Sequence, residues 1–227
     1  VNVLPLKDYN WQGVLVDNNK MVWKKVAIRE PETGITQYMV NASISEDGAL
    51  EGNVMSRHTN HKAYSFRNNY NSEDLDAYLT EKEEGLENIE ISNYKAQNAE
   101  TYEGFVSESY DFYKEEGADV INDKLYIAPM LFLKSTENPF KLDEREYPID
   151  FGYPLKERYM INIAIPENYT VESAPEPMIL KLPEDLGTFQ LSNKVLGNKI
   201  QLSASVELNK ALMGPETYVY LKEFFNQ

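Results

Sequence analysis

The chain has 227 residues, no cysteine, and 37 acidic against 22 basic side chains, for a formal net charge of −15. The missing cysteine excludes thiol nucleophiles, disulfide bonds and thiolate metal sites. The negative charge disfavours nucleic acid and anionic lipid as partners. No apolar run approaches the roughly 18 residues of a membrane-spanning helix. The first residues show neither an initiator Met nor a signal-peptide pattern, so we expect the chain to start inside a longer protein or after processing.

Two β-hairpins are predicted near the start of the chain. The apolar pieces 13–16 and 21–23 flank a short polar turn, which is a hairpin-like pattern. Apolar residues then alternate with polar ones from residue 38 to 44 and return at residues 50–54. The dipeptide Asp47-Gly48 between them is a strong signal for a tight hairpin turn.

The spacing of apolar residues changes between about residues 60 and 84. Ala63, Phe66 and Tyr70 are three and four positions apart, which places them on one helical face. The same spacing returns from Leu75 to Leu79. We therefore predict one or two helices in this stretch, inserted between strands.

The remainder of the chain is predicted to be mainly strand. Five further strands are expected, at residues 87–93, 104–113, 124–133, 158–165 and 198–208. The third is apolar on both faces at residues 125–128, which favours a central position. The last alternates strictly, with one face toward a core and the other toward water. Pro215 is then a natural first residue for a C-terminal helix.

These elements predict a mainly β fold, an antiparallel β-sandwich with one or two mid-chain helices and a short C-terminal helix. Residues 1–35 are expected to be linking strands that lead out of a preceding core. Residues 36–133 form a β-rich part with the helical insertion at about 60–84, and residues 134–227 form a sandwich part that ends in a helix. The polar loop at 135–148 marks a boundary between two lobes, or the chain is one continuous domain.

Few residues offer catalytic or metal chemistry. His58 and His61 are the only histidines, and no third ligand stands at metal-site spacing, so no metal and no cofactor are expected. No Gly-x-Ser-x-Gly motif is present. The carboxylates Asp143, Glu144 and Asp150 lie beside aromatic residues, which leaves a carboxylate-dependent hydrolase as a remote alternative.

Two groups of aromatic residues are candidates for ligand binding. Tyr110 and Phe112 are close in sequence, as are Tyr147, Phe151 and Tyr153. Exposed rings of this kind would form a platform for a glycan or a peptide. Aromatic residues are also common in half-buried strands, so packing inside the sheet is the competing interpretation.

Several stretches resemble a known family. They are residues 4–13 (LPLKDYNWQG), 138–140 (NPF), 147–154 (YPIDFGYP), 165–169 (IPENY) and 215–218 (PETY). Together they are similar to the C-terminal domain of unknown function in transglutaminase-like proteins of Bacteroides-type bacteria. In that family the Cys-His-Asp triad belongs to a preceding papain-like core. Because this chain has no cysteine, no catalytic residue carries over.

The resemblance implies a secreted or periplasmic parent protein and a β-sandwich without catalysis of its own. The first hypothesis is therefore an accessory module that packs on the transglutaminase-like core of the same polypeptide and shapes its substrate cleft. The second is a glycan- or peptide-binding module built from exposed Tyr and Phe. In both cases an extracytoplasmic location, in the periplasm or at the cell surface, is expected.

Overall fold

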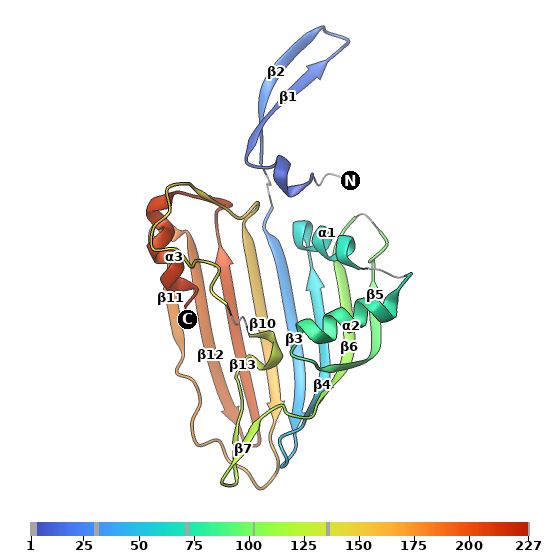
Figure 1. The fold of residues 1–227 in the computed structure, drawn as a ribbon, viewed down its shortest axis with the longest axis vertical. Coiled ribbons are helices and arrows are strands. Elements are labelled where there is room, and N and C mark those ends of the chain that lie inside the picture. Colours follow the sequence, from blue (N-terminus) through green and yellow to red (C-terminus); the bar gives the residue numbers. More distant parts are fainter. Residues whose placement is uncertain (1–3, 30–31, 71–72, 102, 135–136, 227) are drawn as a thin grey trace.

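The computed structural model describes residues 4–29, 32–70, 73–101, 103–134 and 137–226. Its main feature is one large sheet of eight strands (Figure 1). In spatial order the strands are β11 (Met178–Lys181), β12 (Gly187–Leu196), β13 (Lys199–Leu208), β10 (Leu155–Ala164), β3 (Gly34–Ile44), β4 (Leu50–His58), β6 (Val106–Lys114) and β5 (Glu90–Gln97). All neighbours are antiparallel except β3 and β10, which run parallel in the centre of the sheet.

Alternation along each strand gives the sheet two unlike faces. On one face the register aligns a transverse row of core side chains, which are Tyr110, Val54, Val40, Ile161 and Leu202. All five are nearly inaccessible to solvent. We call this side the covered face and the opposite side the open face. The main hydrophobic core lies between the covered face and the elements packed on it.

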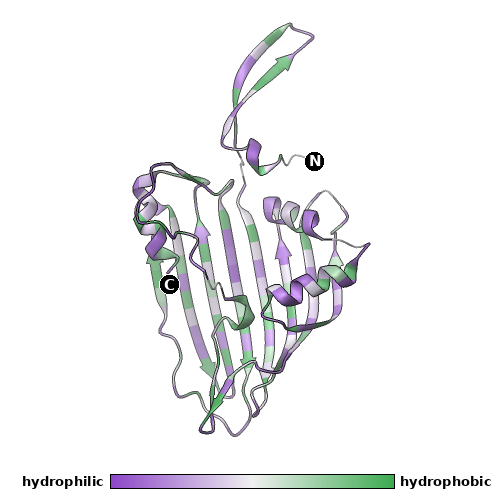
Figure 2. Cartoon of the chain, viewed as in Figure 1, coloured by the Kyte–Doolittle hydropathy of each residue, from purple (hydrophilic) through white to green (hydrophobic). Residues whose placement is uncertain are grey.

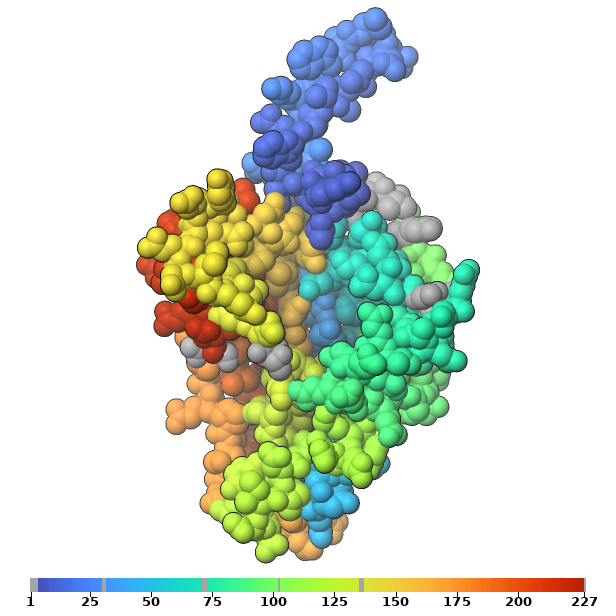
Figure 3. Space-filling view, in the orientation of Figure 1, coloured from blue at the N-terminus to red at the C-terminus, as the bar shows by residue number. Residues whose placement is uncertain are grey.

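Helices, short hairpins and loops form the layer over the covered face. They include α1 (Asn60–Asn69), α2 (Leu75–Gly85), the hairpin β7 (Asp119–Ile121) with β8 (Lys124–Tyr126), and the 3-10 turn η2 (Leu131–Leu133). Asp74 caps α2 by accepting a 3.2 Å hydrogen bond from the backbone N–H of Ala77. The space-filling view shows that this layer hides most of the sheet (Figure 3).

A second core lies at the β11–β12 end of the sheet. It is formed by α3 (Tyr218–Phe224), which follows the turn η4 (Pro215–Thr217), and by the short pair β9 (Ile149–Asp150) and β14 (Leu212–Met213). Tyr218 and Leu221 of α3 are fully buried there, against Phe140 and Leu208. The turn η3 (Pro183–Asp185) joins β11 to β12 beside this core.

The N-terminal hairpin projects away from the rest of the fold (Figure 1). It follows the turn η1 (Leu6–Asp8) and consists of β1 (Trp11–Asp17) and β2 (Val22–Ile28). Its apolar side chains face solvent: Trp11 is 77% and Trp23 is 68% exposed. The hydropathy view shows apolar stretches in the same strands, interrupted by hydrophilic ones (Figure 2). The hairpin thus carries apolar surface that the described residues leave uncovered.

The predicted fold class is confirmed. Strand accounts for 44% of the chain against 19% helix, so the fold is mainly β, with antiparallel-rich sheets, two mid-chain helices and a short C-terminal helix. In a sandwich the covered face would pack against a second sheet, whereas here it packs against helices, a short hairpin and a 3-10 turn. Much of it comes from residues 60–85, where apolar side chains recur every three or four positions and so favour helices over a second set of strands.

One predicted strand is wrong in its extent. Residues 124–133 were expected to form a central strand, but β8 ends at Tyr126 and lies in a two-stranded hairpin. Pro129 follows, and proline cannot donate to a ladder of backbone hydrogen bonds. Leu131 and Phe132 then turn into the core from η2, which explains why this piece is apolar on both sides.

Two features of the sheet were not predicted. Strands β11 and β12 were missed, and β3 was not expected beside β10. The parallel pairing joins residues 34–43 to residues 155–164, so one sheet continues across the loop at 135–148. In the described part of the chain, no helix is long and apolar enough to cross a membrane.

Candidate functional site

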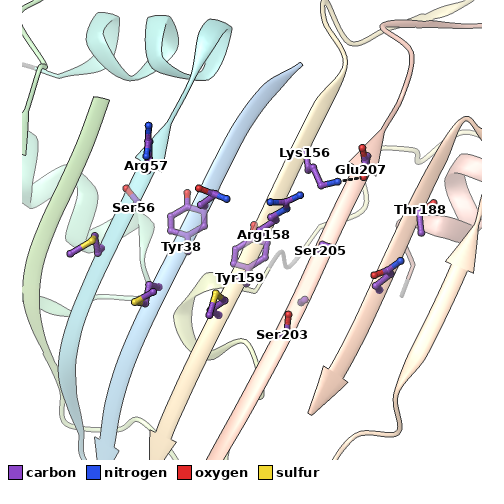
Figure 4. Close-up of a pocket in the computed structure, with 16 residues that line it drawn as sticks. Tyr38, Ser56, Arg57, Lys156, Arg158, Tyr159, Thr188, Ser203, Ser205 and Glu207 are labelled. Carbon is purple, nitrogen blue, oxygen red and sulfur yellow. Dashed lines mark hydrogen bonds and ion pairs between the residues drawn. The ribbon is translucent and has the colours of Figure 1, made fainter. Parts of the chain in front are cut away.

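The open face of the large sheet is left uncovered by the described residues, with exposed side chains on each of its central strands. Figure 4 views it from the side opposite to Figure 1, with β4 and β3 to the left and β13 and β12 to the right. A shallow hollow of about 580 Å³ lies over β4, β3, β10, β13 and β12. Its floor is set by the strand register, which places the outward side chains of neighbouring strands in transverse rows.

The first row contains two arginines. Arg57 of β4 pairs with Gln37 of β3, Gln37 pairs with Arg158 of β10, and Arg158 pairs with Ser205 of β13. The guanidinium carbon of Arg57 lies 4.0 Å from the centre of the Phe105 ring, a cation–π contact that holds the side chain in place. Arg158 is exposed and has no ion pair within the described residues. We call these residues the arginine row.

On one side of the arginine row, the adjacent row contains an ion pair between Lys156 and Glu207. Lys156 Nζ donates to Glu207 Oε2 across the β10–β13 pair, and Figure 4 draws this contact as a dashed line. Thr188 of β12 follows in the same row. Because Glu207 is neutralised by Lys156, it offsets little of the positive charge of the two arginines.

The row on the other side of the arginines contains three methionines. Met55, Met39 and Met160 stand side by side on β4, β3 and β10, and they are 56%, 42% and 53% exposed. Ser203 continues this methionine row on β13. Three adjacent apolar side chains on an open sheet face are adaptable contact surface, because methionine has a flexible and polarizable side chain.

A fourth row, beyond the methionine row, is made of amides. Asn41 Nδ2 donates to Asn53 Oδ1 at 3.1 Å, Asn162 Nδ2 donates to Asn41 Oδ1 at 3.0 Å, and Gln201 Nε2 donates to Asn162 Oδ1 at 3.3 Å. The amide row therefore crosses four strands as one chain of hydrogen bonds. Each amide keeps a further N–H or lone pair that a ligand can use.

Charge is unevenly distributed over the molecule. Seven basic side chains point to the open face in the described strands, which are Arg57, Lys95, Lys156, Arg158, Lys181, Lys194 and Lys199. Four acidic ones share that face, which are Glu51, Glu90, Asp111 and Glu207. The open face is therefore net positive on a chain whose net charge is −15. Such a face attracts acidic partners.

A buried polar network lies on the covered face, and sequence reasoning missed it. Ser56 Oγ lies 2.9 Å from His58 Nε2 and donates to Glu108 Oε1 at 3.1 Å. His58 Nδ1 lies 3.1 Å from Thr36 Oγ1. Burial lowers the pKa of His58 to about 4; Glu108 opposes this shift, and Lys82 adds to it. The imidazole is therefore neutral at pH 7.

This network contains a serine, a histidine and an acid, but its wiring differs from a hydrolytic triad. In a triad the acid orients the histidine, whereas here Glu108 contacts Ser56. Glu108 also accepts hydrogen bonds from Lys82 Nζ at 2.8 Å and from the Tyr94 hydroxyl at 2.9 Å. Its contacts therefore tie α2 to the sheet and link the neighbouring strands β4, β6 and β5.

An ion pair between Lys62 and Glu157 connects α1 to β10 of the sheet. Lys62 Nζ donates to Glu157 Oε1 at 2.7 Å, and the Tyr159 hydroxyl donates to Glu157 Oε2 at 2.8 Å. Burial opposes ionisation of Glu157, but Lys62 and Tyr159 together hold the pKa of this carboxyl below its ordinary value. The polar groups of these two networks on the covered face are thus paired with one another and serve packing.

The aromatic residues predicted to bind a ligand do not form a common exposed surface. Tyr110 and Phe112 point to the covered face and are buried in the main core, and Tyr153 is buried beside α1. Phe151 is half-buried against the second core, and Tyr147 is 74% exposed on a loop. The reason is alternation: Tyr110 and Phe112 are two positions apart and so share the inward side of β6.

The carboxylates considered for hydrolysis make local contacts. Asp150 Oδ1 accepts hydrogen bonds from Asn10 Nδ2 and from the backbone N–H of Gly152, both at 2.8 Å. Asp143 lies 3.5 Å from Lys222 Nζ, and Glu144 is exposed on the same loop. Among the described residues, no group of three or more His, Asp or Glu side chains is placed to hold a metal ion.

One region of the chain is similar to a known family. Residues 123–227 match a family described as a domain of unknown function with a solved structure, DUF3858. The matched region contributes β10 to β13 and α3, and therefore Arg158, Met160 and Asn162 of the open face. No curated protein matches the chain.

Proposed function

We propose that this chain is a non-catalytic accessory module that binds another protein domain through the open face of its eight-stranded sheet. The observation that carries the proposal is the composition of that face. It is uncovered, net positive on an acidic chain, and has three adjacent methionines beside two arginines. Arginine and methionine are enriched at protein interfaces, and a positive patch steers association with acidic surfaces.

A glycan-binding module is the weaker alternative. Sugar rings are held by aromatic side chains on an exposed surface. The described strands place Tyr113 of β6 on the open face, and the Phe105 ring is already occupied by Arg57. Serine and asparagine side chains there could bind hydroxyl groups, but no ring-stacking platform accompanies them. The methionine row suits an apolar protein surface better.

The partner domain we propose is a transglutaminase-like core of the same polypeptide in an extracytoplasmic protein. This assignment rests on the resemblance of residues 4–13 and 147–154 to the region that follows such a core. The projecting hairpin supports a second contact with the same partner. Its exposed Trp11 and Trp23 are accompanied by Lys20, Lys24 and Lys25, so the hairpin is apolar and basic like the open face.

The test uses the transglutaminase-like core and this chain as two separate polypeptides. Isothermal titration calorimetry should detect binding between them. Met55→Glu and Met160→Glu should each weaken it by about tenfold or more, because each variant buries a charge in the contact. Val219→Glu is a matched control, since Val219 is 62% exposed on α3 and lies away from the open face.

Binding that is unaffected by both methionine variants would refute the open face as the docking surface. A loss of binding in the Val219→Glu control would point to α3 instead. Thermal unfolding of each variant checks that the fold is intact, which we expect because Met55 and Met160 are more than half exposed.

A further inference from the structure

We infer that the arginine row is a carboxylate-binding site, in which Arg57 and Arg158 together hold an aspartate or glutamate side chain of an acidic peptide segment. The inference rests on the proposed docking function and specifies its anchor. Arg57 and Arg158 occupy one transverse row of the sheet, with Gln37 between them on β3. All three line the hollow of about 580 Å³ on the open face.

The strand spacing suits a shared carboxylate. Neighbouring strands lie about 4.8 Å apart, so the backbones that carry the two arginines are separated by roughly 10 Å. An arginine side chain is long enough to reach over the neighbouring strand. Arg57 lies against Phe105, just before β6 and on the side of β4 away from Gln37, so we infer that it leaves that ring to meet a carboxylate over Gln37 together with Arg158. A carboxylate has two oxygens, and a guanidinium group offers paired N–H donors that match them. The Gln37 amide supplies a further donor from below.

The two arginines have little else to neutralise them. Arg57 stacks on Phe105, a contact that holds the guanidinium group on the β6 side of β4 and leaves its charge unpaired. The nearest acid in the adjacent row, Glu207, is already paired with Lys156. Arg158 has no ion pair within the described residues, so an incoming anion meets two uncompensated positive charges.

The neighbouring rows favour a peptide over an acidic sugar. Met39, Met55 and Met160 present an apolar surface directly beside the arginines, which suits aliphatic side chains that flank the carboxylate. The amide row beyond them, from Asn53 to Gln201, offers donors and acceptors for a peptide backbone. A polyuronate chain would match the arginines but leave the methionines without an apolar partner.

The test measures binding of a fluorescein-labelled peptide in which glutamate alternates with leucine, using fluorescence polarisation. We expect saturable binding that weakens between about 0.05 and 0.5 M NaCl, because salt screens the charge contacts. A peptide with glutamine in place of glutamate should bind at least about tenfold more weakly. In NMR spectra, the side-chain amide signals of Gln37 should shift when the glutamate peptide is added.

Variants of the protein separate a specific site from general attraction. Arg57→Gln and Arg158→Gln should each weaken binding by about tenfold or more. Arg145→Gln removes the same charge from an exposed loop outside the row, and it should leave binding within about twofold. If the Arg57→Gln and Arg158→Gln variants bind the glutamate peptide as tightly as the unmodified chain does, the inference is overturned.

Three further outcomes are informative. If an oligogalacturonate binds with dependence on both arginines and the glutamate peptide does not, the peptide assignment is wrong. If no acidic probe binds, yet Met55→Glu still abolishes binding of the partner core, the carboxylate anchor is refuted while the docking function stands. If the partner core does not bind at all but the glutamate peptide does, the docking function fails and the site remains.

Discussion

The two faces of the eight-stranded sheet are built from the same strands but differ in almost every property. On the covered face, Val54 and Val40 are 1% and 0% exposed. One position along each strand, Met55 and Met39 stand on the open face, 56% and 42% exposed. The first row stabilises the fold, whereas the second is free to contact something outside the described structure.

The polar groups of the two faces also differ. On the covered face they are paired with one another: Glu108 with Lys82, Ser56 and Tyr94, and Glu157 with Lys62. On the open face the amide row is internally bonded, but Arg57 and Arg158 keep unpaired charge. Buried polar groups must be satisfied to be tolerated, whereas exposed ones are satisfied by water until a ligand replaces it. The contrast therefore separates side chains that hold the fold from those available for binding.

The difference between the two faces is tested most directly by one substitution on each face. Val54→Asp should lower the free energy of unfolding by about 4 kcal/mol or more, because it places an unpaired charge in the core. Met55→Asp, at the next residue, should change it by no more than about 0.5 kcal/mol. Urea unfolding followed by tryptophan fluorescence or circular dichroism measures both. Similar losses in the two variants would mean that the open face is covered in solution.

Removing one partner of the buried network should have the next largest effect. Lys82→Met leaves Glu108, which is nearly inaccessible, without its ammonium partner, and we expect a loss of about 3 kcal/mol. The double variant Lys82→Met with Glu108→Gln should regain part of that stability, because the buried charge is then removed. Denaturant unfolding of the two single variants and the double variant gives the coupling between the side chains. If the loss of stability in the double variant equals the sum of the losses in the two single variants, Lys82 and Glu108 do not stabilise each other.

A smaller loss in the free energy of unfolding is expected when the pH is lowered. The pKa of His58 is lowered to about 4 from an ordinary 6.5, so the unfolded chain binds a proton more readily than the folded one between these values. The stability that depends on neutral His58 is complete above pH 6.5 and is lost as the pH falls towards 4. The loss amounts to about 3 kcal/mol at most.

The measurement is the unfolding midpoint at pH 7 and at pH 4.5, for the unmodified chain and for His58→Gln. The variant should show a smaller decrease, because glutamine does not titrate. Equal decreases would mean that His58 is accessible enough to be protonated in the folded state. Glu108, Lys82, Lys62 and Glu157 face the ring and remain in both proteins, so their contribution is common to the comparison.

Much of the local structure could be predicted from the sequence. Alternation identified β3, β4, β10 and β13, and a three-to-four spacing identified the helical stretch that contains α1 and α2. These signals are local because the side-chain period of a strand or helix is written directly into neighbouring residues. The polar side of β13, from Lys199 to Glu207, was expected to face water and lies on the open face.

The sequence alone also determined that the chain is acidic and cysteine-free, with apolar and polar residues alternating along its strands. It could not determine which strands are neighbours. Arg57 and Arg158 are about a hundred residues apart in the chain, and they share a row because β3 pairs with β4 on one side and with β10 on the other. Strand order and register are set by tertiary packing over long sequence separations, and no local pattern encodes them. The candidate site is a product of that register, and only the tertiary structure brought its rows together.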